Sequence, residues 1–504
     1  MRSLFLLVLT FLAMSASAHA EDWPTSTPEA QGMSSLELAA LVAYGIDNGF
    51  DSMVVTRHGS IVAEAYYAPF SAGTKHRINS STKAVVSTLL AIAMHEGLLK
   101  SVDTPVLDFF PGRTFTNVDA RKKALTVRHL LDMTSGIEWI EPLTNAPPKS
   151  FLEMEASPDW VQFVLDRPMA RDPGASFEYN SGNAHLLSAI LTKVTGKSAL
   201  DYASEKLFGP LGITDVLWRG DPQGNSGGGA GLYLLPRDMA KLGTFWLHDG
   251  VLDGKRLMAE GWIERARRGA VDMPNPGLRY ANQFWSLQGQ DTFMSVGFDR
   301  QLVYVIPKLD LVASFTGSAR YSNADGKPSL PHYSLYGPYD RLKTAARADK
   351  PLPEDPEALA LLKSKIKAVA VEARTEPAGA KPPLAEKISG KTYRMASNML
   401  RLASFSFTFE KDAASFSYEL DGKKYGGPIG LDGHYAVGGN RQYGKSAAKG
   451  RWTDDRTYQL EMQTIGNDDD AQVSFAFDPD GRTVTAKLQS LLGFKLDLTG
   501  EVEK

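Results

Sequence analysis

The sequence has 504 residues, and its 55 basic and 58 acidic side chains leave a formal net charge of −3. So balanced a charge gives no electrostatic reason to expect a nucleic-acid partner. Cysteine is absent, which excludes disulfides, thiol catalysis and cysteine-bound metals, and the length allows two or three domains.

The N-terminal segment 1–20 has the pattern of a secretory signal peptide. Arg2 is followed by an apolar run over 4–9 and by the small-residue site Ala18-His19-Ala20. The run is too short to span a membrane, and no later apolar run approaches ~20 residues. We therefore expect residues 1–20 to be removed and the mature chain to have no integral membrane segment. The protein should be periplasmic or secreted.

The next segments predict strands at both ends of a helical region. Residues 54–64 predict two strands joined by a His58-Gly59 turn. A long apolar helix follows Lys83, and helical sequence punctuated by Gly and Pro continues to about residue 270. Two further strands are predicted at 301–306 and 310–315. This order predicts an α+β domain over 21–350 whose early and late strands share one antiparallel sheet.

The character of the sequence changes after residue 350. Residues 351–385 combine a helix with a Pro-rich linker. Over 386–504 apolar residues alternate with polar ones, as at Phe405, Phe407 and Phe409, and Asp-Gly pairs separate the runs. We predict an all-β barrel or sandwich of about eight strands, to which the sequence assigns no function.

The most informative motif is Ser80-Ser81-Thr82-Lys83, at the head of the apolar helix. Residues three apart on a helix share a face, so Lys83 can reach the hydroxyl of Ser80. A lysine in a dry pocket loses its proton more readily, and the neutral amine can then act as base for a serine nucleophile. The alternative is structural: Ser80 would only cap the helix, and Lys83 would be a surface residue.

Other matches to hydrolase motifs have no suitable surroundings. The Ser-x-x-Lys spacing recurs at Ser364 with Lys367 and at Ser446 with Lys449, but neither lysine has apolar neighbours that could exclude water. We interpret both as chance matches. A Gly-x-Ser-x-Gly match at 224–228 lacks the strand that a nucleophile elbow needs before it. The nine histidines show no metal-binding spacing, so we expect neither a metal nor a cofactor.

Two later segments offer the proton relay and oxyanion hole that a serine nucleophile needs. Tyr179 stands between a loop and an apolar helix, from which its phenol can reach a distant serine. Ser295-Val296-Gly297-Phe298 leads into a strand, where the glycine permits close backbone approach and the next N–H can join that of Ser80. The structural alternatives are a partly buried tyrosine bonded to backbone, and a plain turn or bulge.

Together these segments resemble the superfamily of serine β-lactamases, penicillin-binding proteins and family-VIII esterases. The resemblance covers about 25–345 and includes Ser-x-Thr-Lys at 80–83, Pro-Gly-x-x-Phe-x-Tyr at 173–179 and the glycine-bearing late strand. The wording Tyr-Asn-Ser-Gly at 179–182 is most similar to that of aminohexanoate-dimer hydrolases and related carboxylesterases. The resemblance implies a β-lactamase/transpeptidase-like fold, an antiparallel sheet with a helical region.

The resemblance also implies a role for each matching residue. Ser80 would be the acylated nucleophile, Lys83 its general base, and Tyr179 the relay of the proton to the leaving group. The backbone N–H groups of Ser80 and Phe298, beside Gly297, would hold the oxyanion.

Two departures from the superfamily pattern bear on the substrate. The asparagine of Tyr-x-Asn falls one place early, at Asn180, and Ser181 takes its position. Ser295-Val296-Gly297 replaces Lys-Thr-Gly, so the lysine suited to a substrate carboxylate is missing. Asn180, Ser181 and Ser295 are substrate-pocket candidates. We predict a serine hydrolase of small-molecule esters or amides, with two alternatives: a non-catalytic or weakly active penicillin-recognising protein, or a D-amino-acid peptidase of the cell wall.

Overall fold

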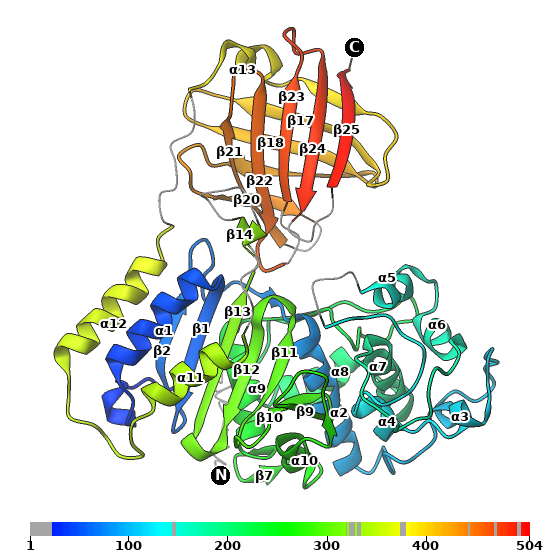
Figure 1. Cartoon of the computed structure of the whole chain (residues 1–504). Helices are drawn as coiled ribbons and strands as arrows, with labels where there is room; N and C mark the ends of the chain where they lie inside the picture. Colours follow the sequence, from blue (N-terminus) through cyan, green and yellow to red (C-terminus); the bar gives the residue numbers. More distant parts are fainter. Residues whose placement is uncertain are drawn as a thin grey trace, which may run out of the picture.

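The computed structural model describes residues 23–143, 148–318, 320–321, 328–329, 334–372, 380–441, 444–467, 471–490 and 495–503. It has two parts, a sheet-and-helix domain and a β-barrel that stands at one end of the sheet (Figure 1). The predicted signal peptide, residues 1–20, lies outside the described residues. No helix within these ranges combines the length and the apolar character that a membrane crossing requires.

The first part is built on one sheet of eight strands in the order β2-β1-β13-β12-β11-β10-β9-β8. Their bounds are β1 Phe50–Arg57, β2 Ser60–Tyr66, β8 Val271–Asp272, β9 Leu278–Ala281, β10 Phe284–Leu287, β11 Phe293–Gly297, β12 Gln301–Ile306 and β13 Leu311–Gly317. Strand β1 pairs antiparallel with β13, which confirms that the early and late strands share a sheet. His58 and Gly59 form the tight turn between β1 and β2, both with positive φ as such hairpins require.

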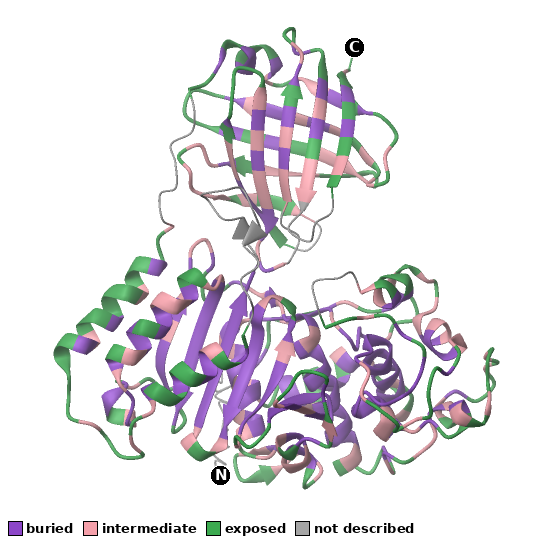
Figure 2. Ribbon diagram, viewed as in Figure 1, coloured by how far each residue is buried: buried purple, intermediate pink, exposed green. Residues whose placement is uncertain are grey.

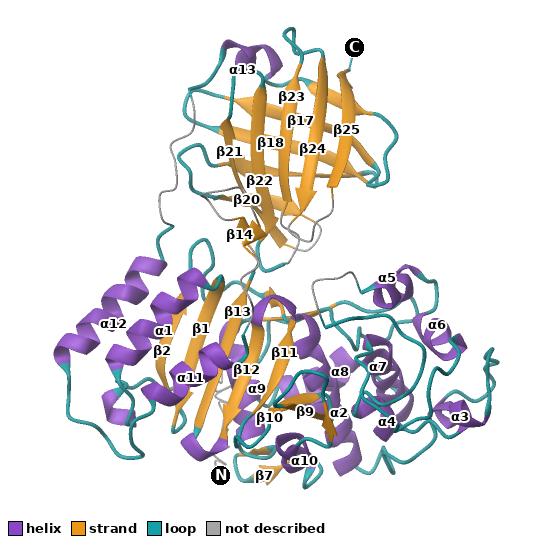
Figure 3. Ribbon diagram, in the orientation of Figure 1, coloured by secondary structure: helices purple, strands orange, loops and turns teal. Residues whose placement is uncertain are grey.

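Helices cover both faces of this sheet (Figure 3). One face packs against α1 (Ser35–Asp47), α11 (Tyr336–Ala345) and α12 (Pro356–Val369). The other face packs against α2 (Thr82–His95), α9 (Pro236–Leu247) and α10 (Trp262–Arg268). Beyond α2 lies a helical region with α3 Ala120–Lys123, α4 Val127–Leu131, α5 Lys149–Ala156, α6 Trp160–Asp166, α7 Ser181–Thr195 and α8 Ala199–Ala203. The predicted α+β fold is confirmed.

Helix α2 is the centre of the helical side. Its residues from Thr82 to Ala93 are all buried, as an apolar surface on every side predicts. Figure 2 shows the same for the central sheet strands, whereas α12 exposes its outer face. The nucleophile motif therefore begins a helix that has no solvent-facing side over these residues.

The second part is a closed barrel of ten antiparallel strands, β16 to β25. Their bounds are β16 Thr392–Met395, β17 Leu402–Phe409, β18 Ala414–Leu420, β19 Lys423–Ile429, β20 Ala436–Arg441, β21 Gly444–Trp452, β22 Thr457–Thr464, β23 Ala471–Phe477, β24 Thr483–Ser490 and β25 Lys495–Val502. Aromatic side chains such as Phe405, Phe407 and Tyr458 fill its core. The predicted barrel is confirmed, but the expected eight strands were too few. Strands β19 and β20 carry glycine pairs in place of alternating large apolar residues, which hides them from a period-two search.

The predicted helix-and-linker segment 351–385 divides between the two parts. Its helix α12 packs against α1 of the first part. Helix α13 (Pro383–Ile388) places Leu384, Ala385 and Ile388 in the barrel core. The boundaries of the four predicted segments themselves stay a prediction.

A three-stranded sheet touches the barrel: β3 (His76–Arg77), β5 (Leu232–Leu234) and β4 (Leu217–Trp218). The free edge of β3 is completed by the turn between β22 and β23, because the Arg77 N–H donates to the carbonyl of Gly466 at 2.7 Å. In the same turn Asn467 Oδ1 accepts a hydrogen bond from Tyr233 Oη at 2.7 Å. Gly466 has φ +80°, and a Cβ there would overlap the carbonyl oxygen of Lys75. The barrel is thus anchored a few residues before Ser80.

The remaining strands form two short antiparallel pairs: β6 Val251–Leu252 with β7 Lys255–Arg256, and β14 Arg320–Tyr321 with β15 Pro328–Ser329.

Candidate active site

Ser80 lies in a single 3₁₀ turn, Asn79–Ser81, that leads directly into α2. It is partly exposed, whereas both of its neighbours are buried. Two hydrogen bonds tie the turn to the segment that follows β11: Ser81 Oγ donates to the carbonyl of Gln301 at 2.6 Å, and Asn79 Nδ2 donates to the carbonyl of Phe298 at 3.1 Å. Asn79 has φ +45°, a conformation that asparagine tolerates better than most residues. These contacts present the Ser80 hydroxyl at the open end of a buried helix.

Lys83 is 1% exposed and its ammonium group has three hydrogen-bond acceptors. Its Nζ lies 2.9 Å from Ser80 Oγ, 2.9 Å from Ser181 Oγ and 2.8 Å from the carbonyl oxygen of Gly229. Burial lowers the pKa of Lys83 to about 8, although the negative charge of Glu141 opposes part of that shift. A neutral lysine is therefore accessible near neutral pH, within hydrogen-bond reach of the serine.

Glu141 is the charged neighbour of this lysine. Its Oε1 accepts from Ser181 Oγ at 2.6 Å, and its Oε2 accepts from the Ser181 N–H at 2.7 Å. The indole Nε1 of Trp139 also donates to Oε2, at 2.7 Å. The carboxylate therefore reaches Lys83 through one hydroxyl, that of Ser181.

Tyr179 closes another side of the site. Its side chain is 8% exposed, and the Nζ of Lys83 lies 4.8 Å from the centre of its ring. Burial, and to a lesser extent the charge of Glu141, raise the pKa of the phenol above its usual range, while a hydrogen bond with the Ser80 side chain acts in the opposite direction. The phenol accordingly stays protonated at any physiological pH and is in contact with the nucleophile.

The late glycine meets the nucleophile turn where an oxyanion hole would lie. Gly297 ends β11, and a Cβ built on it would overlap the carbonyl oxygen of Ile78 and lie 3.1 Å from the Ser81 nitrogen. Only a glycine lets the two backbones approach so closely. The peptide groups of Ser80 and Phe298 therefore lie on adjoining segments, as the predicted pair of N–H donors requires.

The three substrate-pocket candidates differ in their surroundings. Ser181 lies in the site, between Lys83 and Glu141. Asn180 is 1% exposed and caps α7, accepting from the Asn183 N–H at 3.0 Å. Ser295 is 1% exposed in β11, and its Oγ has no partner among the described residues.

Strand β11 has a half-open edge beside the site. In the described part of the chain, β10 pairs with β11 only at Phe293 and Met294. The stretch from Ser295 to Gly297 pairs with β12 on its other side. This unpaired edge of β11 lies next to the half-buried Val296 and the exposed Phe298.

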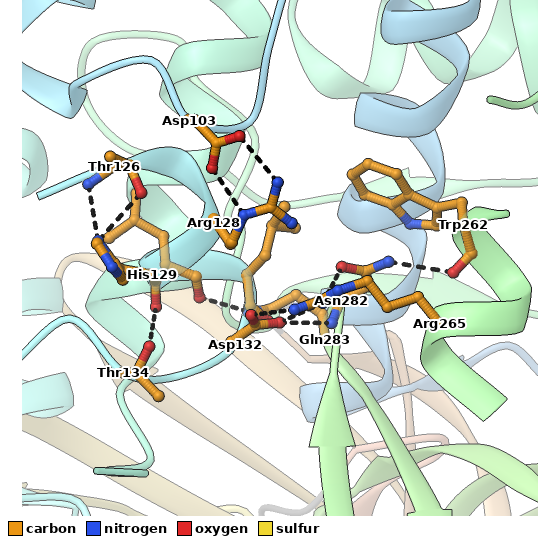
Figure 4. Close-up of polar contacts among 12 residues, drawn as sticks. Asp103, Thr126, Arg128, His129, Asp132, Thr134, Trp262, Arg265, Asn282 and Gln283 are labelled. Atoms are coloured by element: carbon orange, nitrogen blue, oxygen red, sulfur yellow. Dashed lines mark hydrogen bonds and ion pairs between the residues drawn. The ribbon is translucent and has the colours of Figure 1, made fainter. Parts of the chain in front are cut away.

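A polar cluster joins α10, the end of α4 and the β9–β10 turn (Figure 4). Arg265 of α10 forms an ion pair with Asp132 and donates to Asn282 Oδ1 at 2.7 Å. Gln283 Nε2 donates to the carbonyl of Leu130 at 2.9 Å. The cluster fixes the β9–β10 turn to the end of α4. That hairpin carries Trp285, whose ring packs beside Tyr179, and Tyr280, whose ring packs against that of Trp285.

The competing motifs have structural explanations. Ser364 and Lys367 lie on the exposed face of α12, and Ser446 and Lys449 lie in strand β21, where residues three apart point to opposite faces. Ser226 lies in a loop and accepts from the Leu200 N–H at 3.0 Å through its hydroxyl. Within the described ranges, none of these serines has a buried lysine beside it.

A family model described as Beta-lactamase matches residues 41–335, the stretch that contains every part of this site. The chain belongs to the β-lactamase family. Its relatives include a 6-aminohexanoate-dimer hydrolase of Paenarthrobacter ureafaciens, 25% identical over 285 residues, or 52% of this chain and 71% of that protein. Monacolin J acid methylbutanoyltransferase of Aspergillus terreus is 27% identical over 164 residues, covering 30% of this chain and 40% of that one.

The solved structures agree with this membership of the β-lactamase family. A family VIII carboxylesterase superposes with a TM-score of 0.50 at 16% identity, over 64% of this chain and 98% of that one. At that identity the likeness concerns the fold alone. The resemblance expected from the sequence motifs is confirmed.

Two members of the site were not predicted from the sequence. Gly229 contributes only its backbone carbonyl, and a pattern of side chains cannot predict such a contact. Glu141 follows Ile137-Glu138-Trp139-Ile140, where a second glutamate stands three positions earlier, so the local sequence gave no reason to single out Glu141. Its partners Ser181 and Lys83 are far away in sequence, so no spacing rule joins them.

Proposed function

We propose that this protein is a serine hydrolase that cleaves an ester or amide bond through a covalent acyl-Ser80 intermediate. The observation that carries the proposal is the pair Lys83 and Ser80: a dry lysine nitrogen 2.9 Å from a partly exposed serine hydroxyl. The relative named as a 6-aminohexanoate-dimer hydrolase, matched over 52% of this chain, supports the same class of reaction.

The reaction begins when neutral Lys83 takes the hydroxyl proton of Ser80 as Oγ attacks the carbonyl carbon of the substrate. The carbonyl oxygen becomes an oxyanion and is held by the N–H groups of Ser80 and Phe298. Collapse of the tetrahedral intermediate breaks the bond to the leaving group, which receives a proton from the Tyr179 phenol. The proton held by Lys83 then restores the phenol. Water repeats the sequence on the acyl-enzyme, releasing the acid and returning the proton to Ser80 Oγ.

The shifts in pKa favour this division of labour. The lowered pKa of Lys83 makes it the group that can accept a proton near neutral pH. The raised pKa of Tyr179 makes a tyrosinate base unfavourable and leaves the phenol as a donor. We therefore assign the base to Lys83 and the relay to Tyr179.

The surroundings favour substrates without a carboxylate beside the scissile bond. The position of the β-lactamase lysine is held by Ser295, a neutral residue buried in β11. Phe298 is 39% exposed and Ile140, next to Glu141, is 50% exposed, so apolar side chains are available at two places near the site. An uncharged ester or amide fits this environment better than a penicillin or a D-alanyl peptide. We also propose a periplasmic or secreted location, which the N-terminal sequence pattern supports and N-terminal sequencing of the mature protein would test.

The test compares the parent with the Ser80→Ala variant on a nitrophenyl ester of a short acid. We expect the parent to turn over and the variant to lose on the order of a thousandfold or more in kcat. A fluorophosphonate should label the parent at Ser80, located by peptide mass spectrometry. Ser364→Ala is the matched control, because Ser364 has the same Ser-x-x-Lys spacing on an exposed helix face. Equal turnover by the Ser80→Ala variant, or no labelling of the parent, would reject the proposal.

A further inference from the structure

The hydrogen bonds around Lys83 restrict where its proton-accepting electron pair can point. A neutral amine has two N–H donors and one lone pair. The nitrogen has three neighbours: Ser80 Oγ, Ser181 Oγ and the carbonyl oxygen of Gly229. Since the carbonyl oxygen of Gly229 can only accept, one N–H must point at it. The remaining N–H and the lone pair are shared between the two serines.

Glu141 decides which serine receives the remaining N–H. A carboxylate can only accept, so the hydroxyl proton of Ser181 must lie on the 2.6 Å bond to Glu141 Oε1. With its proton committed, Ser181 Oγ can only accept from Lys83. The lone pair of Lys83 is then left for the hydroxyl proton of Ser80.

We propose that Glu141 is a positioning residue that acts through Ser181 to direct the lone pair of neutral Lys83 at the nucleophile. The inference rests on the proposed function, because it concerns how the same serine is activated. Glu141 touches neither Ser80 nor the place of the substrate carbonyl in this scheme. Its effect passes through a single hydroxyl.

The carboxylate is well placed for this role because it is itself held on both oxygens. Oε2 accepts from the Ser181 N–H at the start of α7 and from Trp139 Nε1. Trp139 is 4% exposed and packs edge-on against Phe163. Among the described residues, Glu141 is also the charge that acts on the pKa of Lys83, and the other titratable neighbour, Tyr179, is neutral.

Replacing Glu141 by glutamine keeps the shape but reverses the direction of one hydrogen bond. In the Glu141→Gln variant the amide can donate to Ser181 Oγ, which frees the hydroxyl proton of Ser181 to point at the nitrogen of Lys83. It then competes with Ser80 for the lone pair. Loss of the negative charge also lowers the pKa of Lys83 further. The lysine is then neutral at a lower pH, but its lone pair points at the Ser80 hydroxyl for a smaller fraction of the time.

The experiment measures the rate at which a fluorophosphonate phosphonylates Ser80 Oγ, with loss of fluoride, as a function of pH. For Glu141→Gln we expect the midpoint of the profile to fall below that of the parent, while the plateau at high pH drops by about tenfold to a hundredfold. Glu138→Gln is the matched control, because this nearby carboxylate is largely exposed and pairs with Arg167. We expect it to change neither the midpoint nor the plateau.

Ser181→Ala provides a second, independent test. It removes the hydroxyl through which Glu141 acts, so we expect a comparable loss of plateau rate and no further loss when Glu141→Gln is added. Thermal unfolding of each variant is measured alongside, and the second variant keeps the test decisive if the first does not fold.

The outcomes separate the possible roles of Glu141. A lower midpoint with an unchanged plateau would mean that Glu141 acts only through its charge, and a lower plateau together with a clearly lower unfolding temperature would mean that it acts on the fold. Either result, or additive losses in the double variant, would overturn the inference. A parent that is not labelled at Ser80 would instead reject the proposed function.

Discussion

Gly297 leaves no room for a side chain against the carbonyl oxygen of Ile78. The two residues belong to segments more than two hundred positions apart in sequence, the end of β11 and the turn that carries Ser80. Their contact sets the separation between the peptide groups of Ser80 and Phe298. The width of the proposed oxyanion hole therefore depends on the absence of one methyl group.

This contact predicts the effect of Gly297→Ala. The added Cβ must push β11 away from the nucleophile turn, so the two N–H donors can no longer converge on one oxygen. We expect kcat for a nitrophenyl ester to fall by about 10²- to 10³-fold. Gly73→Ala is the control, since a Cβ on Gly73 meets open space. Parental kcat in the Gly297→Ala variant would show that this approach is not needed.

The buried lysine predicts the pH dependence of the reaction. The pKa of Lys83 is lowered from 10.5 to about 8, so the neutral, active base accumulates as pH rises through about 8. Acylation should therefore increase with pH, reach half its maximum near that value and then level off. Lys83→Arg should abolish both the activity and its rise with pH, because a guanidinium does not lose its proton in this range. A midpoint close to 10.5 in the parent would argue against a dry lysine base.

The neutral phenol of Tyr179 predicts that the Tyr179→Phe substitution lowers kcat and leaves KM nearly unchanged. The ring and its packing against Trp285 remain, while the proton donor to the leaving group is lost. We expect kcat to fall by about 10²- to 10⁴-fold with little change in KM. Tyr280→Phe is a close control, because Tyr280 is fully buried nearby and its hydroxyl has no partner among the described residues. A change confined to KM would remove the relay role from Tyr179.

The barrel contact predicts the effect of Gly466→Ala. The glycine has φ +80°, and a Cβ would overlap the carbonyl oxygen of Lys75, so the turn must leave the edge of β3. We expect faster proteolysis between the two parts of the protein and a lower kcat, because Ser80 follows β3 directly. Gly422→Ala adds the same kind of backbone strain, at φ +71°, where a Cβ meets open space. If both variants behave alike, strain rather than undocking explains the effect.

The sequence predicted those features that depend on neighbouring residues. The His58-Gly59 hairpin and the apolar helix after Lys83 follow from local turn chemistry and hydrophobic pattern. The motif around Ser80 and the position of Tyr179 at a helix start were likewise predicted, and the structure brings these two side chains into contact. Their catalytic roles stay predictions.

What the sequence did not predict depends on contacts between distant segments. Glu141 belongs to the site because the chain folds it onto Ser181, and no periodicity encodes that meeting. Helix α7 also uses the Asn180 side chain as its N-terminal cap, a role that the sequence did not single out, and the place of Asn180 in the substrate pocket stays a prediction. The number of strands in the barrel was underestimated, because the glycine-bearing strands β19 and β20 are held by backbone hydrogen bonds to their neighbours. Those bonds do not depend on the pattern of side chains.

The docking of the barrel turn also has a consequence for the order of biosynthesis. Tyr233 and Asn467 are 234 positions apart, and the Arg77–Gly466 bond closes a still longer loop. At about 5–20 residues per second, β3 would wait on the order of tens of seconds on the ribosome for its last edge partner. We expect nascent chains stalled before the β22–β23 turn to label poorly with a fluorophosphonate, even when the sheet and α2 have emerged. Such a delay would keep the Ser80 hydroxyl unreactive until translation is nearly finished.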